Sequence, residues 1–515
     1  MNRRTLILIG ACAALLTLPA RRASAWDVEI NAETIGQGYQ LVAGNGDLVS
    51  RRRLDQYLGL NVWNIGKKDS FGQPLRDNQF YFTSSMRLSF DFGDYLLGTP
   101  TIGGRNVAPE LGNNRFDLLF FYFGGRDVGG FIDFKVGRQI EYSLFELLSF
   151  DGLSVEAKTP WWFAVSAYGG LLVNGFLPID SAIYRPDGTA PGVLSPHDMD
   201  PKPVVGAGVR AIGFRDLDAS FGYRRVFSPG TDLGCTLGST DLRTIESCTK
   251  ATSGTTEEVL AWQARYRILD GLIIPWAGFR YNLLVDRLDV IEAGASFNIS
   301  PKHALRAEYV YSYPTFDGDS IWNLFARSQF DDVRVGYDLR LGRFRGWARA
   351  LVRIFHDING GPDFSPAGSV DGGGSLGGRV DLKQGFLRAD LYGELGYGGT
   401  KVGVDLSGRF KVWRDILGLE GRLTYVHFED DHHTSNYADS FGFQVGARVS
   451  FWKGMLLHLI FEDNINRFDL SQIRFYALLD VTALVGGYGF MAGSPRGIGP
   501  GMGQYGGAYG TGMGY

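Results

Sequence analysis

Histidine, cysteine and carboxylate residues offer this chain few combinations that could do chemistry. Of seven histidines, two adjoin carboxylates in Asp430-Asp431-His432-His433, but no second cluster completes a metal site. Asp317-Gly318-Asp319 resembles half of a calcium loop and lacks its closing glutamate. No Gly-rich phosphate loop or nucleophile elbow occurs in a fitting strand–turn–helix context. The sequence therefore predicts a non-enzyme with no catalytic residues, no metal and no cofactor.

A ladder of basic residues is the stronger functional signal. Arg345, Arg349 and Arg353 are spaced by four, which on a strand places them on one face, about 13 Å apart. The neighbouring segments add basic residues on the same face: Arg334, Arg340, Arg379, Lys383, Arg388, Lys401, Arg409, Lys411, Arg422, Arg448 and Arg474. Against these 14 basic residues stand eight acidic ones: Asp338, Asp381, Asp390, Glu394, Asp405, Glu420, Glu462 and Asp480. Two interpretations stay open: a pore lining that favours anions, and a salt-bridge network that merely fills the interior.

The elements that must position this ladder are β-strands. In Val333 to Leu341 the odd positions are apolar and the even ones are polar, charged or glycine, and 401–412 alternates in the same way. A period of two indicates a strand. About 22 such segments follow one another between residues 28 and 485. Repeated strands with one apolar and one charged face predict a transmembrane antiparallel β-barrel of about 22 strands, within a range of 18–24.

The connections between these segments sort by length. One set is short, with turns predicted at 124–127, 159–161, 213–215, 269–271, 300–302, 342–343, 384–385, 414–415 and 453–454. The alternate set contains long connections at 93–113, 174–201, 227–255, 314–329, 357–373 and 429–437, and only 65–76 is long on the short side. Short periplasmic turns and long extracellular loops are typical of outer-membrane barrels. Because alternation begins at Val28, no room is left for an N-terminal plug, and the loops 174–201 and 227–255 are the expected constriction.

Composition and the first residues fix the expected compartment. Glycine reaches 72 of 515 residues, aromatics 14% and net charge −4, which disfavours disorder and nucleic-acid binding. Residues 1–25 read as a signal peptide: Arg3-Arg4, an apolar stretch from Leu6 to Leu18, and Ala23-Ser24-Ala25 before a cut between Ala25 and Trp26. A lipoprotein signal at Cys12 is a weaker alternative. The mature chain lacks the run of about 20 apolar residues that a membrane helix needs. We expect residues 26–485 to form the barrel, in the outer membrane of a Gram-negative bacterium.

Two features lie outside the strand pattern. Cys235 and Cys248 fall in one long, polar connection, and an oxidising compartment favours a disulfide between them over two free thiols. Residues 486–515 form a Gly/Tyr-rich periplasmic tail. The tail reads either as a flexible low-complexity extension or as a peptide that docks a periplasmic partner or enters the pore.

One hairpin resembles a known family. Lys135-Val136-Gly137-Arg138-Gln139 followed by Phe150-Asp151-Gly152-Leu153 is similar to the Gly-Arg-Gln and Phe-Asp-Gly hairpin of alginate-export and related substrate-specific porins. The match covers about 20 residues of 515. It implies a lumen whose arginines and lysines pass an anionic polysaccharide. The long loops and the tail also resemble large myxobacterial-type barrels, some of which serve polysaccharide secretion, motility or adhesion.

These observations predict a channel for hydrophilic or anionic solutes, with polysaccharide export as one form of that role. The alternative is a structural or adhesive component of a trans-envelope complex for motility or surface attachment. Its working surfaces would be the loops 174–201, 227–255 and 314–329, the last of which carries the apolar run Ile321 to Phe325. Expected partners are outer-membrane lipid, the barrel-assembly machinery and a periplasmic protein at 486–515.

Overall fold

A computed structural model of the chain describes its strands and many of the turns between them. The described residues are 27–42, 48–65, 79–91, 101–102, 105–106, 115–143, 146–173, 202–227, 255–284, 286–313, 329–356, 369–396, 399–430, 437–452, 454–466 and 471–485. The predicted signal peptide with its cut at Ala25 and Trp26, the cysteines Cys235 and Cys248, and the tail 486–515 lie outside these residues. Those predictions therefore stay predictions.

Nearly all of the described chain is β-strand. The strands are β1 (Asp27–Val42), β2 (Leu48–Ile65), β3 (Gln79–Asp91), β4 (Thr101–Ile102), β5 (Arg105–Asn106), β6 (Arg115–Val128), β7 (Ile132–Ser143), β8 (Glu146–Lys158), β9 (Phe163–Leu172), β10 (Pro203–Ala211), β11 (Leu217–Phe227), β12 (Thr255–Tyr266), β13 (Ile273–Asn282), β14 (Arg287–Ser300), β15 (His303–Ser312), β16 (Phe330–Leu341), β17 (Phe344–Phe355), β18 (Val370–Leu382), β19 (Gly385–Gly396), β20 (Gly399–Trp413), β21 (Leu417–Glu429), β22 (Tyr437–Trp452), β23 (Met455–Ile465) and β24 (Gln472–Val485). A 3-10 turn, Leu269–Gly271, precedes β13. No helix among the described residues is long and apolar enough to cross a membrane.

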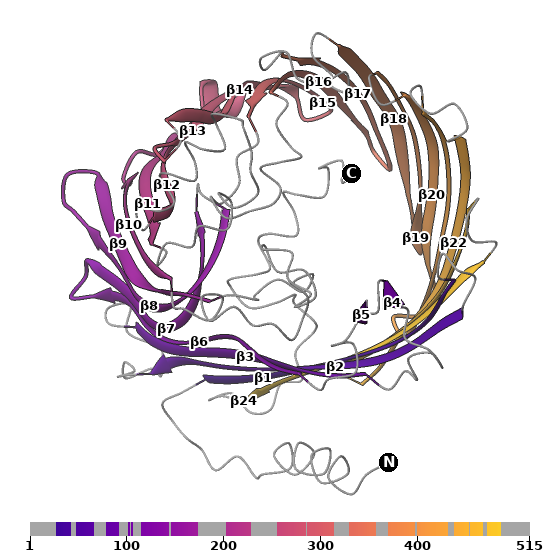
Figure 1. The fold of residues 1–515 in the computed structure, drawn as a ribbon, viewed down its shortest axis with the longest axis horizontal. Coiled ribbons are helices and arrows are strands. Elements are labelled where there is room, and N and C mark those ends of the chain that lie inside the picture. The colour runs from indigo at the N-terminus through magenta and orange to yellow at the C-terminus, as the bar shows by residue number, and fades with distance from the viewer. Residues whose placement is uncertain are drawn as a thin grey trace, which may run out of the picture.

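These strands close into one ring (Figure 1). Apart from the small β4–β5 pair, each strand pairs antiparallel with its sequence neighbours, and β1 pairs with β24, with Glu33 opposite Asp480. The ring has 22 strands, which confirms the predicted fold class and strand number. Closure pairs every strand of the ring with two neighbours. A sheet that crosses a bilayer needs this, because lipid cannot hydrogen-bond the backbone groups of an open edge.

The side chains alternate between the two faces of the ring. On β16 the apolar Val333 and Val335 are 49% and 44% exposed on the outside, whereas Asp332, next to Val333, is fully buried on the inside. The register carries this alternation from strand to strand, since Arg334 lies opposite Leu351 and Gly336 opposite Arg349. The outside is therefore apolar and the inside polar, as the period of two predicts.

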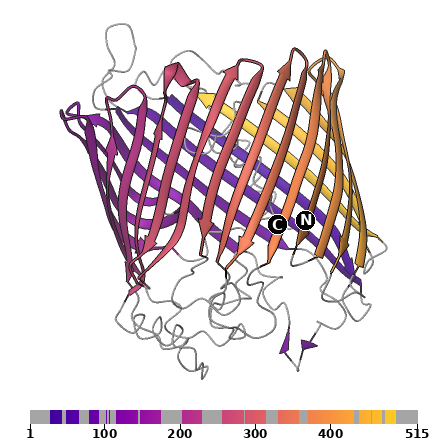
Figure 2. The same ribbon diagram turned by 90° about the horizontal axis from the view of Figure 1, so that it is seen from above.

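Short turns gather at one end of the barrel, and the longer connections leave from the other (Figure 2). The short set joins β6–β7, β8–β9, β10–β11, β12–β13, β14–β15, β16–β17, β18–β19, β20–β21 and β22–β23. Gly342 at φ 59° opens a two-residue turn with Arg343, the kind that glycine favours in a hairpin. The long connection between β2 and β3 is the exception on the short side, as the sequence indicated.

One predicted turn is wrong. Residues 124–127 belong to β6, and the chain reverses at 129–131 instead. Neighbouring aromatic rings leave no room for a side chain at Gly124 and Gly125. A Cβ at Gly124 would lie 2.4 Å from the Tyr81 ring, and one at Gly125 would lie 2.5 Å from the Phe134 ring. Sequence alone cannot separate such a glycine from a turn glycine.

The hairpin of β7 and β8 departs from the wall. Lys135 Nζ and Glu141 Oε2 lie 3.9 Å apart, although an extended strand would separate their Cα atoms by about 20 Å. The bend is at Gly137, whose φ of 122° suits glycine. Beyond the bend, Phe150 is fully buried and packs with Val204 on the inner wall. Violet strand segments lie inside the ring beside β10–β12 in Figure 1. This hairpin narrows the lumen, whereas the predicted constriction loops 174–201 and 227–255 lie largely outside the described residues.

Candidate functional site

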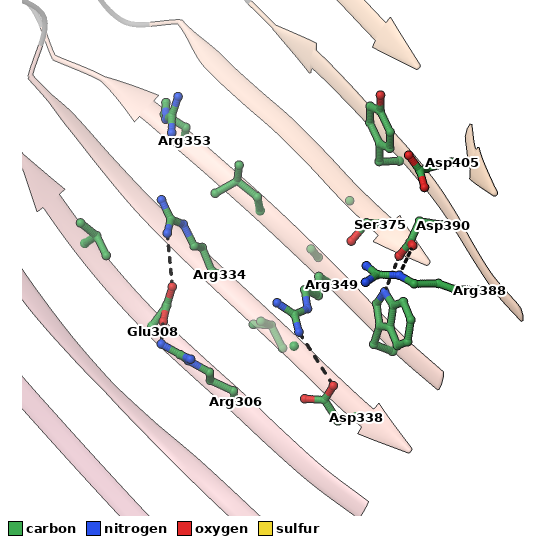
Figure 3. Close-up of a pocket in the computed structure, with 18 of the residues that line it drawn as sticks. Arg306, Glu308, Arg334, Asp338, Arg349, Arg353, Ser375, Arg388, Asp390 and Asp405 are labelled. Carbon is green, nitrogen blue, oxygen red and sulfur yellow. Dashed lines mark hydrogen bonds and ion pairs between the residues drawn. The ribbon is translucent and has the colours of Figure 1, made fainter. Parts of the chain in front are cut away.

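The inner wall of β13–β21 forms the candidate site. It borders a recess of about 1130 Å³ that takes residues from strands far apart in sequence, from Trp276 on β13 to Thr424 on β21 (Figure 3). Five of the predicted ladder residues line it, namely Arg334, Arg349, Arg353, Arg388 and Arg422. Arg306 on β15 also lines it and was not predicted, because the sequence argument began the ladder at β16.

The three arginines of β17 share one inner face but differ in their surroundings. Arg345 Nη2 lies 3.3 Å from Asp381 Oδ2, and Arg349 Nη2 lies 3.8 Å from Asp338 Oδ1. Arg353 Nε lies 2.7 Å from Asp332. Side-chain exposure falls along the strand: Arg345, Arg349 and Arg353 are 56%, 40% and 14% exposed. The ladder therefore runs from a solvated arginine to an enclosed one.

Asp332 is the carboxylate that pairs with Arg353, the least exposed arginine of the three. It is fully buried, and both Arg353 and Arg334 donate hydrogen bonds to it, Arg334 at 2.5 Å. The Arg353 guanidinium also lies 4.4 Å from the centre of the Phe330 ring. Sequence reasoning missed Asp332, although its even position on β16 is the signal that places it inside with Arg334.

Aromatic rings support other members of the ladder. The Arg388 guanidinium stacks 4.9 Å from the Trp347 ring centre and bonds Asp390 through Nε at 2.5 Å. The Trp347 indole donates to the same carboxylate at 2.9 Å. Arg306 lies 4.7 Å from the centre of the Trp276 ring. Such contacts hold flat, charged groups against the wall.

Three more ladder residues, on β18, β20 and β21, are also paired. Arg409 donates to Glu420 at 2.8 Å, and His458 contacts the other oxygen of that carboxylate at 2.7 Å. Arg422 donates to Asp405 through Nε at 2.6 Å. Arg379 donates to Asp381 at 2.8 Å and stacks on Phe386. The structure thus places these arginines in ion pairs rather than in an uncompensated row.

The predicted ladder residues nearest the short turns are different. Arg340 is at the short-turn end of β16, and Lys383 lies in the turn between β18 and β19, outside the strands. Neither side chain has an ion-pair partner among the described residues. Positive charge without a partner is therefore found near the short turns rather than in the middle of the ladder.

The recess can bind and guide polar solutes, but its groups are not arranged for covalent chemistry. Its lining combines six arginines with Glu292, Glu308, Asp338, Asp390 and Asp405. Within the described residues, no group of three His, Cys, Asp or Glu side chains could hold a metal. Most of the predicted cluster Asp430 to His433 lies outside those residues.

Fold and site together define a class of protein. A closed, antiparallel barrel of 22 strands, apolar outside and charged inside, with short turns at one end, is a porin-like β-barrel of the Gram-negative outer membrane.

The chain matches no known family model, and no curated protein matches its sequence. Solved structures to which it is similar include OccAB4 of Acinetobacter baumannii, at 10% identity over 90% of this chain and 98% of that one, with a TM-score of 0.41. OccK5 (OpdH) of Pseudomonas aeruginosa has 10% identity over 90% and 98% of the chains and a TM-score of 0.38. A BenF-like porin of Pseudomonas fluorescens has 7% identity over 89% and 99%, with a TM-score of 0.41. Identities of this size transfer no residue role and no substrate.

Proposed function

We propose that this barrel is a passive channel for small hydrophilic solutes with a modest preference for anions. The observation that carries the proposal is the charged recess on the lumen wall, where Arg306, Arg334, Arg349, Arg353, Arg388 and Arg422 meet five carboxylates. A wet wall of this kind offers solutes hydrogen bonds in place of those they lose from water. No covalent step is required of the protein.

The preference for anions is modest because the arginines are largely neutralised. Asp332 alone compensates part of the charge of both Arg334 and Arg353. Among the ion pairs of the recess, the Arg349–Asp338 pair is the loosest, at 3.8 Å with both side chains at least 40% exposed. An exposed pair of this length contributes little stability, so either charge can turn to a passing ion. Arg349 is therefore the residue expected to guide anions.

The test is ion conductance of the refolded, full-length protein in a planar bilayer, with the reversal potential measured in a salt gradient. Wild type should conduct steadily and pass anions somewhat better than cations. Arg349→Gln should shift the reversal potential toward cation preference, and Asp338→Asn should shift it toward anion preference, because each removes one charge from the same recess. Equal reversal potentials for all three proteins would remove the guiding role, and a silent, folded barrel would contradict the channel.

Polysaccharide export and the structural role in a trans-envelope complex remain predictions. Most of the residues that would serve the structural role, in the loops 174–201, 227–255 and 314–329 and in the tail 486–515, lie outside the described residues. Deleting 486–515 separates the two functions: lost recruitment of a periplasmic partner with conductance intact favours the structural one.

A further inference from the structure

The short-turn end of the barrel carries a row of exposed cations. Six consecutive short turns, from β10–β11 to β20–β21, each place one basic residue at or beside the reversal: Arg215, Arg267, Lys302, Arg343, Lys383 and Arg414. All six are exposed, and none of their side chains forms an ion pair with a described residue. We call them the turn cations.

Their lack of partners contrasts with the lumen. Along the ladder even the half-exposed Arg345 and Arg388 have carboxylate partners, at 3.3 Å and 2.5 Å. Among the six turns, Asp216 lies beside Arg215 and Asp270 lies in the turn of Arg267. Asp415 is held by Lys411 at 2.5 Å, a hydrogen bond that lowers the pKa of that carboxyl. The three consecutive turns at 301–302, 342–343 and 383–384 contain no acidic residue. This sector therefore has uncompensated positive charge.

Exposed aromatic side chains lie beside the first and the last of the six turns. Phe214 precedes Arg215, Trp413 precedes Arg414, and both rings are exposed, at 49% and 60%. Exposed aromatic residues at the end of the apolar band of a barrel mark the boundary between hydrocarbon and headgroups. The turn cations thus lie at the depth of lipid headgroups, on the periplasmic side.

We propose that the turn cations bind the phosphate groups of anionic phospholipids in the periplasmic leaflet of the outer membrane. Basic residues next to a membrane surface are attracted by anionic headgroups, and the attraction falls off within a Debye length. Turns on neighbouring hairpins present their cations along one rim, so several headgroups are held in a row. The lipids would fix the depth and tilt of the barrel on the side opposite its long loops.

The experiment titrates the purified, full-length protein in detergent with phosphatidylglycerol or phosphatidylcholine and counts bound lipid by native mass spectrometry. Wild type should bind phosphatidylglycerol more tightly, and added salt should weaken that binding. Lys302→Gln with Arg343→Gln removes two turn cations and should weaken phosphatidylglycerol binding about 30-fold. The charge-retaining pair Lys302→Arg with Arg343→Lys should bind as wild type does.

Arg52→Gln is the matched control, because Arg52 is exposed on β2 toward the opposite end of the barrel. It should leave phosphatidylglycerol binding unchanged. The proposal is overturned if the Gln double variant binds both lipids as wild type does, or if Arg52→Gln weakens phosphatidylglycerol binding as much as the double variant does. It is also overturned if the double variant loses only its binding to peptidoglycan fragments. Heat-modifiable mobility confirms folding, and conductance in zwitterionic bilayers should equal wild type, which separates this test from that of the channel.

Discussion

Asp332→Ala tests whether the buried ion pairs of Asp332 with Arg334 and Arg353 stabilise the barrel. Asp332 is fully buried, and it accepts hydrogen bonds from Arg353 at 2.7 Å and from Arg334. Removing the carboxylate deletes the 2.7 Å ion pair of Arg353, whose side chain is only 14% exposed. The Asp338→Ala variant is the matched comparison, because its partner Arg349 is 3.8 Å away and solvated.

The expected magnitudes differ severalfold. At an effective dielectric constant near 20, two charges separated by the 2.7 Å of the Arg353–Asp332 contact attract by about 6 kcal/mol before desolvation is subtracted. Breaking a buried pair from one side costs about 3–5 kcal/mol, since the other charge is left uncompensated. Loss of the exposed Arg349–Asp338 pair should cost at most about 1 kcal/mol.

The assay is urea unfolding in lipid vesicles, followed by tryptophan fluorescence, with conductance recorded on the same preparations. Asp332→Ala should lower the free energy of unfolding by several kcal/mol, while Asp338→Ala should leave it within about 1 kcal/mol of wild type. Both should move the reversal potential toward anion preference, because each deletes one negative charge from the lumen. Equal losses of unfolding free energy in the two variants would refute the distinction between a stabilising role for Asp332 and an anion-guiding role for the Arg349–Asp338 pair.

Three further predictions concern glycines and an aromatic ring. Gly124→Ala should destabilise the barrel by about 1–3 kcal/mol in the same urea assay, because its Cβ would lie 2.4 Å from the Tyr81 ring, whereas Gly372→Ala, with nothing within 4 Å, should not. Gly137→Ala should unbend the β7–β8 hairpin and raise single-channel conductance, because φ is 122° there and the Cβ would lie 2.3 Å from a backbone oxygen of Phe121; an unchanged conductance would contradict its role as the constriction. Trp347→Leu should weaken block of the current by aromatic anions, because the Trp347 ring gives their rings a surface to stack on beside the Arg388 guanidinium. Chloride conductance should stay near wild type, and dose–response curves in the planar bilayer would measure both.

The alternation of the sequence was enough to predict the fold. Because side chains on a strand point to opposite faces in turn, Val333, Val335 and Tyr337 had to share a face that excludes Arg334. The repetition of that pattern, with short and long connections in turn, specified both closure and strand number. The turn at 124–127 was wrong because glycine serves close packing as well as reversal, and only the position of Tyr81 on the neighbouring strand distinguishes the two.

The ion pairing of the ladder arginines could not be predicted from the sequence. The inward direction of Arg345, Arg349 and Arg353 follows from their spacing, but their partners depend on register between strands. Asp381 is 36 residues from Arg345, yet the pairing of β17 with β18 puts Arg379 opposite Arg345 and brings Asp381 to 3.3 Å. A count of basic and acidic residues therefore overstated the free positive charge, since Asp332 had been left out of it.

The distribution of paired and free charge bears on how such a barrel selects solutes. Fixed ion pairs on the lumen wall form local dipoles, which orient a solute and fall off faster with distance than a single charge does. A uniform row of free arginines would retain polyanions by strong attraction, and release would be slow. Pairs that range from the enclosed Arg353–Asp332 to the solvated Arg349–Asp338 instead offer sites of graded strength along one strand. That arrangement suits the passage of small solutes better than the retention of a long anionic chain.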